Sequence, residues 1–146
     1  MKAAATSSRP LESAAHLYKL RVYFEDTDAG GMVYYANYLK FAERARTEML
    51  RDAGINHAEM VARDGLMFVV RRCTAEFHRP ARLDDELEVA TRVMDMAGAS
   101  LTLAQAIRRG GELLVEISVT VACINREGRA TRLPERVRAR VGTALN

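Results

Sequence analysis

The alternation of apolar and polar residues over 112–124 (ELLVEISVTVACI) is the feature that most constrains the fold. Every odd position from Leu113 to Cys123 is apolar, whereas the even positions include Glu116 and Thr120. Successive side chains of a strand point to opposite faces of a sheet, so this period of two predicts a long, half-buried strand. Shorter versions of the same pattern cover 66–78, 86–96 and 100–109.

A helix is predicted between an earlier strand and these four. Residues 17–24 (LYKLRVYF) are rich in aromatic and β-branched residues, which favours a strand. Residues 35–54 (YANYLKFAERARTEMLRDAG) have the period of a helix. Their apolar residues recur at steps of three and four: Leu39, Ala42, Ala45, Met49 and Ala53. We expect this helix to begin near Val33–Tyr35 and to end at Gly54, a residue suited to the position after a helix.

The order of the elements is therefore strand, long helix, then four strands joined by short turns. The glycine pair in RRGGE (108–112) predicts a hairpin between the last two strands. Short turns imply antiparallel neighbours. We expect an α+β fold in which a five-stranded antiparallel sheet wraps around one long central helix. Because Leu114, Ala122 and Ile124 add apolar residues at even positions, the other sheet face is expected to be open or covered by a second copy.

The chain length and the terminal residues suggest one domain with two tails. A chain of 146 residues fits one domain of ordinary size. We expect a disordered N-terminal tail at 1–16, the folded domain at 17–135 and a basic C-terminal tail at 136–146. The first residues lack the apolar stretch of a signal peptide. No apolar run approaches the roughly 20 residues that span a bilayer. A cytoplasmic protein without membrane insertion is predicted.

Charge and cysteine content narrow the classes of partner. The formal net charge is +3, and the basic residues are dispersed without an aromatic-rich basic stripe, which disfavours nucleic acid and would suit an anionic small ligand. Cys73 and Cys123 share no metal-like spacing with each other or with the histidines, so they are expected to be reduced, buried thiols. No metal and no cofactor are expected.

The segment DTDAGGMVYYANY (26–38) carries the candidate chemistry. Asp26 and Asp28 follow the first strand, and Gly30 and Gly31 permit a positive φ or close approach of another group. The first N–H groups of the following helix form a positive end that polarises a carbonyl. A carboxylate, free space beside the backbone and N–H donors are the parts that an acyl-transfer hydrolase needs.

Two simpler explanations of this segment are weaker. Aspartate and glycine before a helix are ordinary cap and turn residues, but a cap needs one aspartate and no glycine pair. A hard-cation loop draws several oxygen ligands from one compact segment, and here the carboxylates stop at Asp28. A metal site is therefore not predicted.

Residues 22–50 (VYFEDTDAGGMVYYANYLKFAERARTEML) resemble the signature of hotdog-fold acyl-CoA thioesterases. The resemblance is strongest to the branch related to 4-hydroxybenzoyl-CoA thioesterase and associated with the Tol-Pal envelope system of bacteria. Residues 68–89 (FVVRRCTAEFHRPARLDDELEV) resemble the second strand and following turn of that family. The resemblance implies a hotdog fold, and a homodimer or tetramer with active sites at the subunit interface.

The same resemblance assigns roles to individual residues. In the D-x-D-x-x-G pattern the second aspartate is catalytic and maps onto Asp28. The backbone N–H that maps onto Tyr35 donates to the thioester carbonyl, although many relatives carry histidine at that position. Gly31, Val33 and Tyr34 are expected to contact the substrate, and Tyr38 is expected either to pack near the acyl pocket or to belong to the core.

Three further residues have two explanations each. Glu43 is either a second catalytic candidate, since another hotdog branch uses a helix glutamate, or an ion-pair partner of Arg46 or Lys40. Arg71 and Arg72 interrupt the apolar alternation of their strand. They are expected either to contact the coenzyme A phosphates or to form interface salt bridges with Asp84, Asp85 or Glu86. Asp26 is expected to hold the turn.

The predicted function is hydrolysis of acyl-CoA thioesters of short to medium aliphatic chain length. Asp28 acts either as general base or as nucleophile, and a thiolate with pKa of about 8.5 leaves without a strong general acid. The alternatives are a non-catalytic hotdog module that binds acyl groups or an acyl-carrier or envelope-associated protein partner, and a nucleic-acid-binding module. The intact DTDAGG favours the enzyme.

Overall fold

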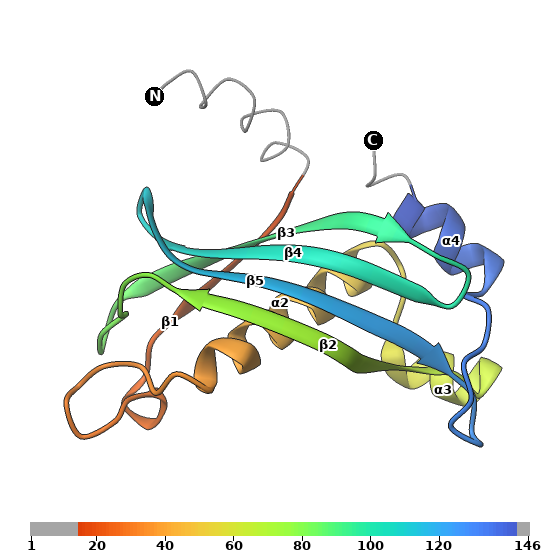
Figure 1. Cartoon of the computed structure of the whole chain (residues 1–146), viewed down its shortest axis with the longest axis horizontal. Coiled ribbons are helices and arrows are strands. Elements are labelled where there is room, and N and C mark those ends of the chain that lie inside the picture. The colour runs from red at the N-terminus through yellow and green to blue at the C-terminus, as the bar shows by residue number, and fades with distance from the viewer. Residues whose placement is uncertain (1–14, 143–146) are drawn as a thin grey trace.

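A five-stranded antiparallel sheet forms one layer of the protein (Figure 1). The computed structural model describes residues 15–142. The strands are β1 (His16–Arg21), β2 (Met67–Phe77), β3 (Glu86–Met96), β4 (Ser100–Arg109) and β5 (Glu112–Ile124). They lie in the order β1-β3-β4-β5-β2, and each neighbouring pair is antiparallel. The predicted α+β class and five-stranded antiparallel sheet are confirmed.

Three α-helices and one 3-10 turn complete the part of the chain that the structure describes. They are η1 (Phe24–Asp26), α2 (Asn37–Asp52), α3 (His57–Asp64) and α4 (Glu135–Gly142). The prediction of one long central helix is not confirmed in that form. Helix α2 has 16 residues, and the eight-residue helices α3 and α4 pack beside it in the core.

Helix α2 also begins later than the sequence predicted. The Val33 N–H donates to the Ala81 carbonyl at 2.9 Å, and the Tyr34 N–H donates to the Asp26 carbonyl at 3.0 Å. These bonds hold residues 33–34 in an extended path. The helix therefore starts at Asn37 rather than near Val33–Tyr35.

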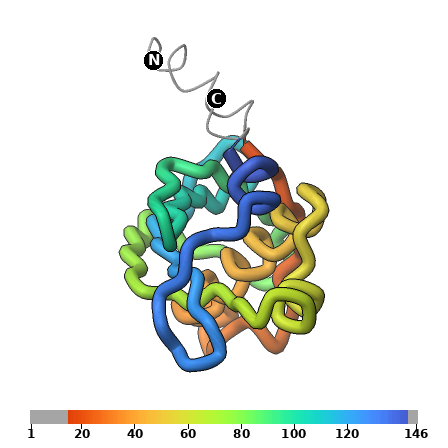
Figure 2. Tube along the Cα trace, turned by 90° about the vertical axis from the view of Figure 1, so that its right-hand side faces the viewer, coloured from red at the N-terminus to blue at the C-terminus, as the bar shows by residue number. Residues whose placement is uncertain are grey.

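The core lies between the helices and one face of the sheet. The odd positions of β5 from Val115 to Cys123 are buried, as the alternation predicted. One cluster of buried residues surrounds the first half of α2, and a second joins its last turn to α3 and α4. Seen from the end of the molecule, the C-terminal segment crosses that end before it reaches α4 (Figure 2).

Two β-bulges explain irregularities of the strand pattern. The register of β2 against β5 shifts between Val70 and Arg72, so Arg71 is an extra residue. This is why the arginine pair interrupts the alternation. A second shift leaves Leu114 extra in β5, where it is fully buried. Leu114 was expected to add apolar surface to the open sheet face, and that expectation is wrong.

The predicted tails lie partly outside the described residues. Residues 1–14 and 143–146 lie beyond them. Most of the segment expected to be a basic C-terminal tail forms α4, in which Val137 and Val141 are buried. Both cysteines are free thiols, with Cys123 buried as predicted and Cys73 exposed. The exposure of Cys73 follows from its place on β2, which pairs with a neighbour on one side only.

Candidate active site

Asp26 holds the chain between β1 and α2. Its side chain is 9% exposed, and Oδ2 accepts a hydrogen bond from the Tyr23 N–H at 2.8 Å. Its carbonyl accepts from the Tyr34 N–H and from Nδ2 of Asn37. Asp26 thus ties the end of the first strand to the start of α2, which agrees with the structural role predicted for it.

Asp28 lies two residues further on, in an exposed loop. Its Oδ1 accepts from the Gly30 N–H at 2.9 Å and from the Met32 N–H at 3.3 Å. Gly31 closes this loop at φ 80°, a conformation that favours glycine. These bonds fix the direction of the carboxylate and use one of its two oxygens. Within residues 15–142, Oδ2 of Asp28 has no hydrogen-bond partner.

Unbonded backbone donors mark the start of α2. The N–H groups of Val33, Tyr34 and Asn37 donate to backbone carbonyls. Over the described chain, the N–H groups of Tyr35 and Ala36 donate to no acceptor, and the N-cap residue Ala36 offers no side-chain cap. Free N–H groups at a helix start carry partial positive charge and can donate hydrogen bonds to an oxyanion or to a polarised carbonyl oxygen.

A cavity of about 410 Å³ is lined by both Asp28 and Tyr35. Its lining includes Asp28, Tyr35 and Tyr38 from the first half of the chain and Phe77 and Arg79 from the end of β2. Figure 1 shows the loop before α2 and the C-terminal end of β2 at the same end of the molecule. A carboxylate and an unbonded N–H at one cavity can polarise a carbonyl and supply a base or nucleophile.

Aromatic side chains form the walls of this cavity. The Phe77 ring lies 6.1 Å from that of Tyr35 and 5.9 Å from that of Tyr38, measured between ring centroids. Tyr34 and Tyr35 are at the exposed rim, whereas Tyr38 is 3% exposed. Burial raises the pKa of Tyr38 above its usual value near 10, with smaller opposing effects of the Ala81 N–H and Arg109. The phenol is therefore neutral at physiological pH.

Most of the residues predicted from the first segment lie at this cavity. Val33, Tyr34, Tyr35 and Tyr38 line it together with Asp28, whereas Gly31 shapes the loop without lining it. Phe77 and Pro80 were not predicted as site residues, and His78 was assigned no role. These three residues end or follow β2, whose pairing brings them here, and nothing in their local pattern indicates a site. Met32 also lines the cavity and lies inside the segment that was predicted to carry the chemistry. The His78 ring bonds Glu116 on β5 at 2.9 Å.

Other predicted residues lie elsewhere. Glu43 lines a separate cavity of about 190 Å³ with Arg46, Met49 and Phe68. Its carboxylate accepts from the Thr47 hydroxyl at 2.7 Å, and over residues 15–142 it forms no ion pair with Arg46 or Lys40. Arg71 and Arg72 are exposed on β2 and do not line the Asp28 cavity. Asp85 pairs with Arg109 instead, at 2.7 Å.

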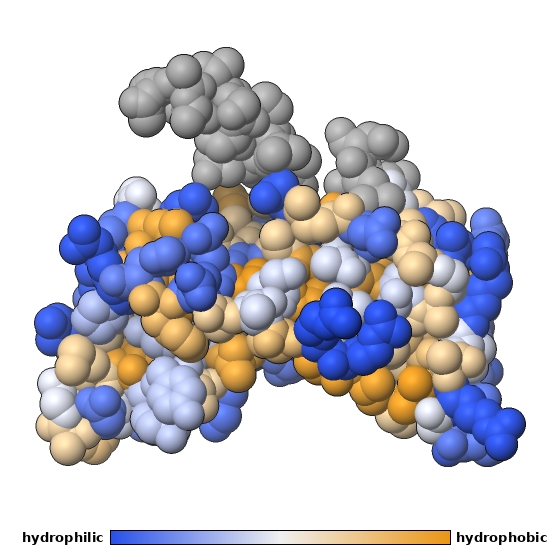
Figure 3. Space-filling view, viewed as in Figure 1, coloured by the Kyte–Doolittle hydropathy of each residue, from blue (hydrophilic) through white to orange (hydrophobic). Residues whose placement is uncertain are grey.

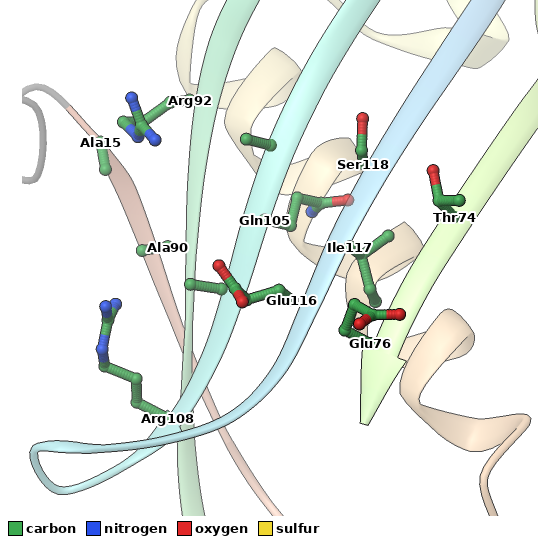
Figure 4. Close-up of a pocket in the computed structure, with 12 residues that line it drawn as sticks. Ala15, Thr74, Glu76, Ala90, Arg92, Gln105, Arg108, Glu116, Ile117 and Ser118 are labelled. Atoms are coloured by element: carbon green, nitrogen blue, oxygen red, sulfur yellow. The ribbon is translucent and has the colours of Figure 1, made fainter. Parts of the chain in front are cut away.

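A larger hollow of about 520 Å³ lies on the opposite sheet face (Figures 3 and 4). Figure 4 shows Arg92 and Arg108 on its β3–β4 side and Glu76 and Glu116 toward β5 and β2. Much of its lining comes from β3, β4 and β5, whose backbones pair with one another in the sheet. The Asp28 cavity is lined both by a carboxylate and by a residue with an unbonded N–H, so it is the candidate for the chemistry.

Comparisons with known proteins show the family of the chain. Residues 22–141 match the Thioesterase-like superfamily. The chain belongs to this family. An acyl-CoA thioester hydrolase YbgC from Escherichia coli O157:H7 is 48% identical over 109 residues, which cover 74% of this chain and 81% of the relative. An acyl-CoA thioesterase YbgC from Haemophilus influenzae is 42% identical over 108 residues, which cover 74% of this chain and 79% of the relative.

Solved structures support the same family. A probable thioesterase from Bartonella henselae superposes with a TM-score of 0.80 at 43% identity, and the match covers 82% of this chain and 99% of that one. Separately, none of the helices among residues 15–142 is long and apolar enough to cross a membrane.

Proposed function

We propose that this protein hydrolyses acyl-CoA thioesters to the free acid and coenzyme A. The observation that carries the proposal is the meeting of the Asp28 carboxylate and the unbonded Tyr35 N–H at one cavity. Its family and its YbgC relatives support the same activity.

In the proposed reaction the thioester carbonyl oxygen accepts a hydrogen bond from the Tyr35 N–H. Asp28 either removes a proton from water, whose oxygen bonds to the carbonyl carbon, or bonds to that carbon itself to give an anhydride that water then cleaves. The carbon–sulfur bond breaks and the thiolate leaves, since a thiol pKa of about 8.5 makes it a good leaving group. The hydrogen bonds to Oδ1 leave Oδ2 of Asp28 available for either role.

The proposed substrates carry short to medium aliphatic acyl groups. The cavity of about 410 Å³ is of the size of small-ligand sites, and Tyr34, Tyr38 and Val33 supply apolar walls. Arg71 and Arg72 remain proposed contacts of the coenzyme A phosphates, and their exposure supports access to such a ligand. Glu43 is the less favoured catalytic residue, because it lines a different cavity.

The proposed functional unit is a hotdog-type homodimer or tetramer with sites at the subunit interface. Strand β2 is at the edge of the sheet, is 11 residues long and exposes Val70 and Phe77. An unpaired edge of this length favours pairing with a second chain. In such an assembly the two sheets would enclose the α2 helices, and β2 of one protomer would border the cavity of its partner.

We also propose a cellular location and a class of partner for the protein. A cytoplasmic location is supported by the two free cysteines, and the YbgC relatives are consistent with the Tol-Pal-associated branch. We propose no binding of nucleic acid by this protein. A non-catalytic acyl-binding or protein-binding module would not need the unbonded donors beside a fixed carboxylate.

A thiol-release assay over acyl-CoAs of increasing chain length tests the proposed substrate class. We expect the highest kcat/KM for short to medium chains and a decline for long ones, because the cavity is bounded by Tyr38 and Phe77. Equal rates across all lengths would contradict the proposed chain length. Release from none of them would contradict the proposed function.

A further inference from the structure

The buried Tyr38 hydroxyl donates to no acceptor in the part of the chain that the structure describes. Its oxygen accepts a hydrogen bond from the Ala81 N–H at 2.9 Å. A phenol has one O–H donor besides its acceptor lone pairs, so this bond leaves the proton of Tyr38 unused. Throughout residues 15–142 no group accepts that proton. A donor left unused inside a cavity wall can find its acceptor in a bound ligand.

The geometry of the helix directs this hydroxyl toward the free backbone donors. Side chains of a helix lean toward its N-terminus, so Tyr38 in the first turn covers the residues just before α2. The contacts agree with this direction. Ala81, which bonds the Tyr38 hydroxyl, also bonds the Val33 N–H through its carbonyl at 2.9 Å. Through Ala81 the hydroxyl is thus joined to Val33, two residues before the unbonded Tyr35 N–H.

We propose that the Tyr38 hydroxyl donates a second hydrogen bond to the thioester carbonyl oxygen, beside the Tyr35 N–H. This inference rests on the proposed thioesterase activity and adds a catalytic residue to it. As the carbonyl carbon becomes tetrahedral, negative charge develops on its oxygen, and two preorganised donors stabilise that charge more than one. The phenol keeps its proton during the reaction, so no proton transfer is required of it.

The test compares Tyr38→Phe with the wild-type protein in steady-state thiol release. Loss of one oxyanion donor lowers kcat by about 10²-fold, and we expect KM to stay within about threefold because the donor acts mainly in the transition state. Tyr18→Phe is the matched control. Tyr18 packs against the same core cluster without lining the cavity, so its variant should keep the wild-type kcat.

A second variant separates this role from a merely structural one. Tyr38→Phe also removes the acceptor of the Ala81 N–H, which could displace the segment before β3. Arg109→Met loosens the same segment and keeps the Tyr38 hydroxyl, since Arg109 donates to the Pro80 carbonyl at 3.2 Å and to Asp85 at 2.7 Å. We expect Arg109→Met to raise KM with a smaller change in kcat, the reverse of Tyr38→Phe.

The outcomes distinguish this inference from the proposed function. If the wild type releases thiol and Tyr38→Phe retains kcat, or shows the same raised KM as Arg109→Met, the inference is wrong and the proposed function stands. If the wild type releases thiol from no acyl-CoA, the proposed function fails and this inference fails with it. A selective loss of kcat in Tyr38→Phe supports the second donor.

Discussion

At the scale of single residues, two aspartates separated by one position have different environments. The Asp26 carboxylate is buried and bonded to the Tyr23 N–H, whereas the Asp28 carboxylate is exposed at the cavity. The sequence predicted a structural role for Asp26, because a turn needs one aspartate, and the catalytic role that the family pattern gives to Asp28 stays a prediction. The sequence could not reveal that Oδ2 of Asp28 has no hydrogen-bond partner within residues 15–142, or that Tyr35 lines the same cavity.

Asp26→Ala is expected to destabilise the protein. Removing the carboxylate leaves the partly buried Tyr23 N–H without its acceptor, which costs about 1–3 kcal/mol of unfolding free energy. Asp28→Ala should cost less than half as much, since the N–H groups of Gly30 and Met32 are in an exposed loop and can bond water. Urea denaturation of both variants checks this. Equal losses would mean that Asp26 has no special structural role.

Residues from distant parts of the chain could not be assigned to the site from the sequence. Phe77 and Pro80 are more than 35 positions from Asp28, and no local pattern distinguishes them from other strand-end residues. They reach the cavity because β2 pairs with β5 and because the Ala81 carbonyl bonds the Val33 N–H. Which distant residues meet at the cavity depends on the pairing of the whole sheet and not on the residues at the strand ends.

At the scale of elements, the strand pattern predicted the sheet, but local hydrogen bonds decided the boundaries. Alternation located β5 because burial of one face has a period of two, and the glycine pair after β4 located the hairpin between them. The bulge at Arg71 was not predicted, since an extra residue shows only as a break in the pattern. The start of α2 was placed too early, because bonds of Val33 and Tyr34 to other segments compete with helix formation.

The segment between β2 and β3 should show a pH-dependent contribution to stability. Burial raises the pKa of Asp85, but hydrogen bonds from the Arg82 N–H and the Arg109 guanidinium outweigh it, so the pKa lies below its ordinary value. A lowered folded-state pKa stabilises the protein above the unfolded-state value of about 3.9, and the stabilisation is lost as pH falls through the folded-state pKa.

Asp85→Asn therefore tests this ion pair. We expect the variant to be less stable than the wild type from pH 5 to pH 7, and the difference in unfolding free energy to shrink below about pH 4. Asp95→Asn is the control, because Asp95 is exposed and has no partner in the described chain. Thermal unfolding at several pH values gives the answer. A difference that grows on acidification would contradict the lowered pKa of Asp85.

At the scale of the whole molecule, the uncovered edge strand β2 is the feature that a single chain leaves unexplained. Val70 on β2 is 53% exposed, and β2 pairs with β5 alone. Val70→Asp is expected to shift the protein from dimer to monomer in sedimentation experiments, because a charge at an apolar interface is costly to bury. Met94→Asp on β3, at a residue that is 51% exposed, should leave the dimer unchanged. A wild-type monomer would refute the proposed assembly.

The most direct test of the proposed chemistry is thiol release by Asp28→Asn. Asparagine keeps an oxygen that can accept from the Gly30 and Met32 N–H groups, so the loop and the assembly should stay intact. It cannot act as a base or a carboxylate nucleophile, and we expect hydrolysis of acyl-CoAs to fall by at least about 10³-fold. A variant that folds and assembles like the wild type and keeps its full rate would contradict the assignment of the chemistry to Asp28.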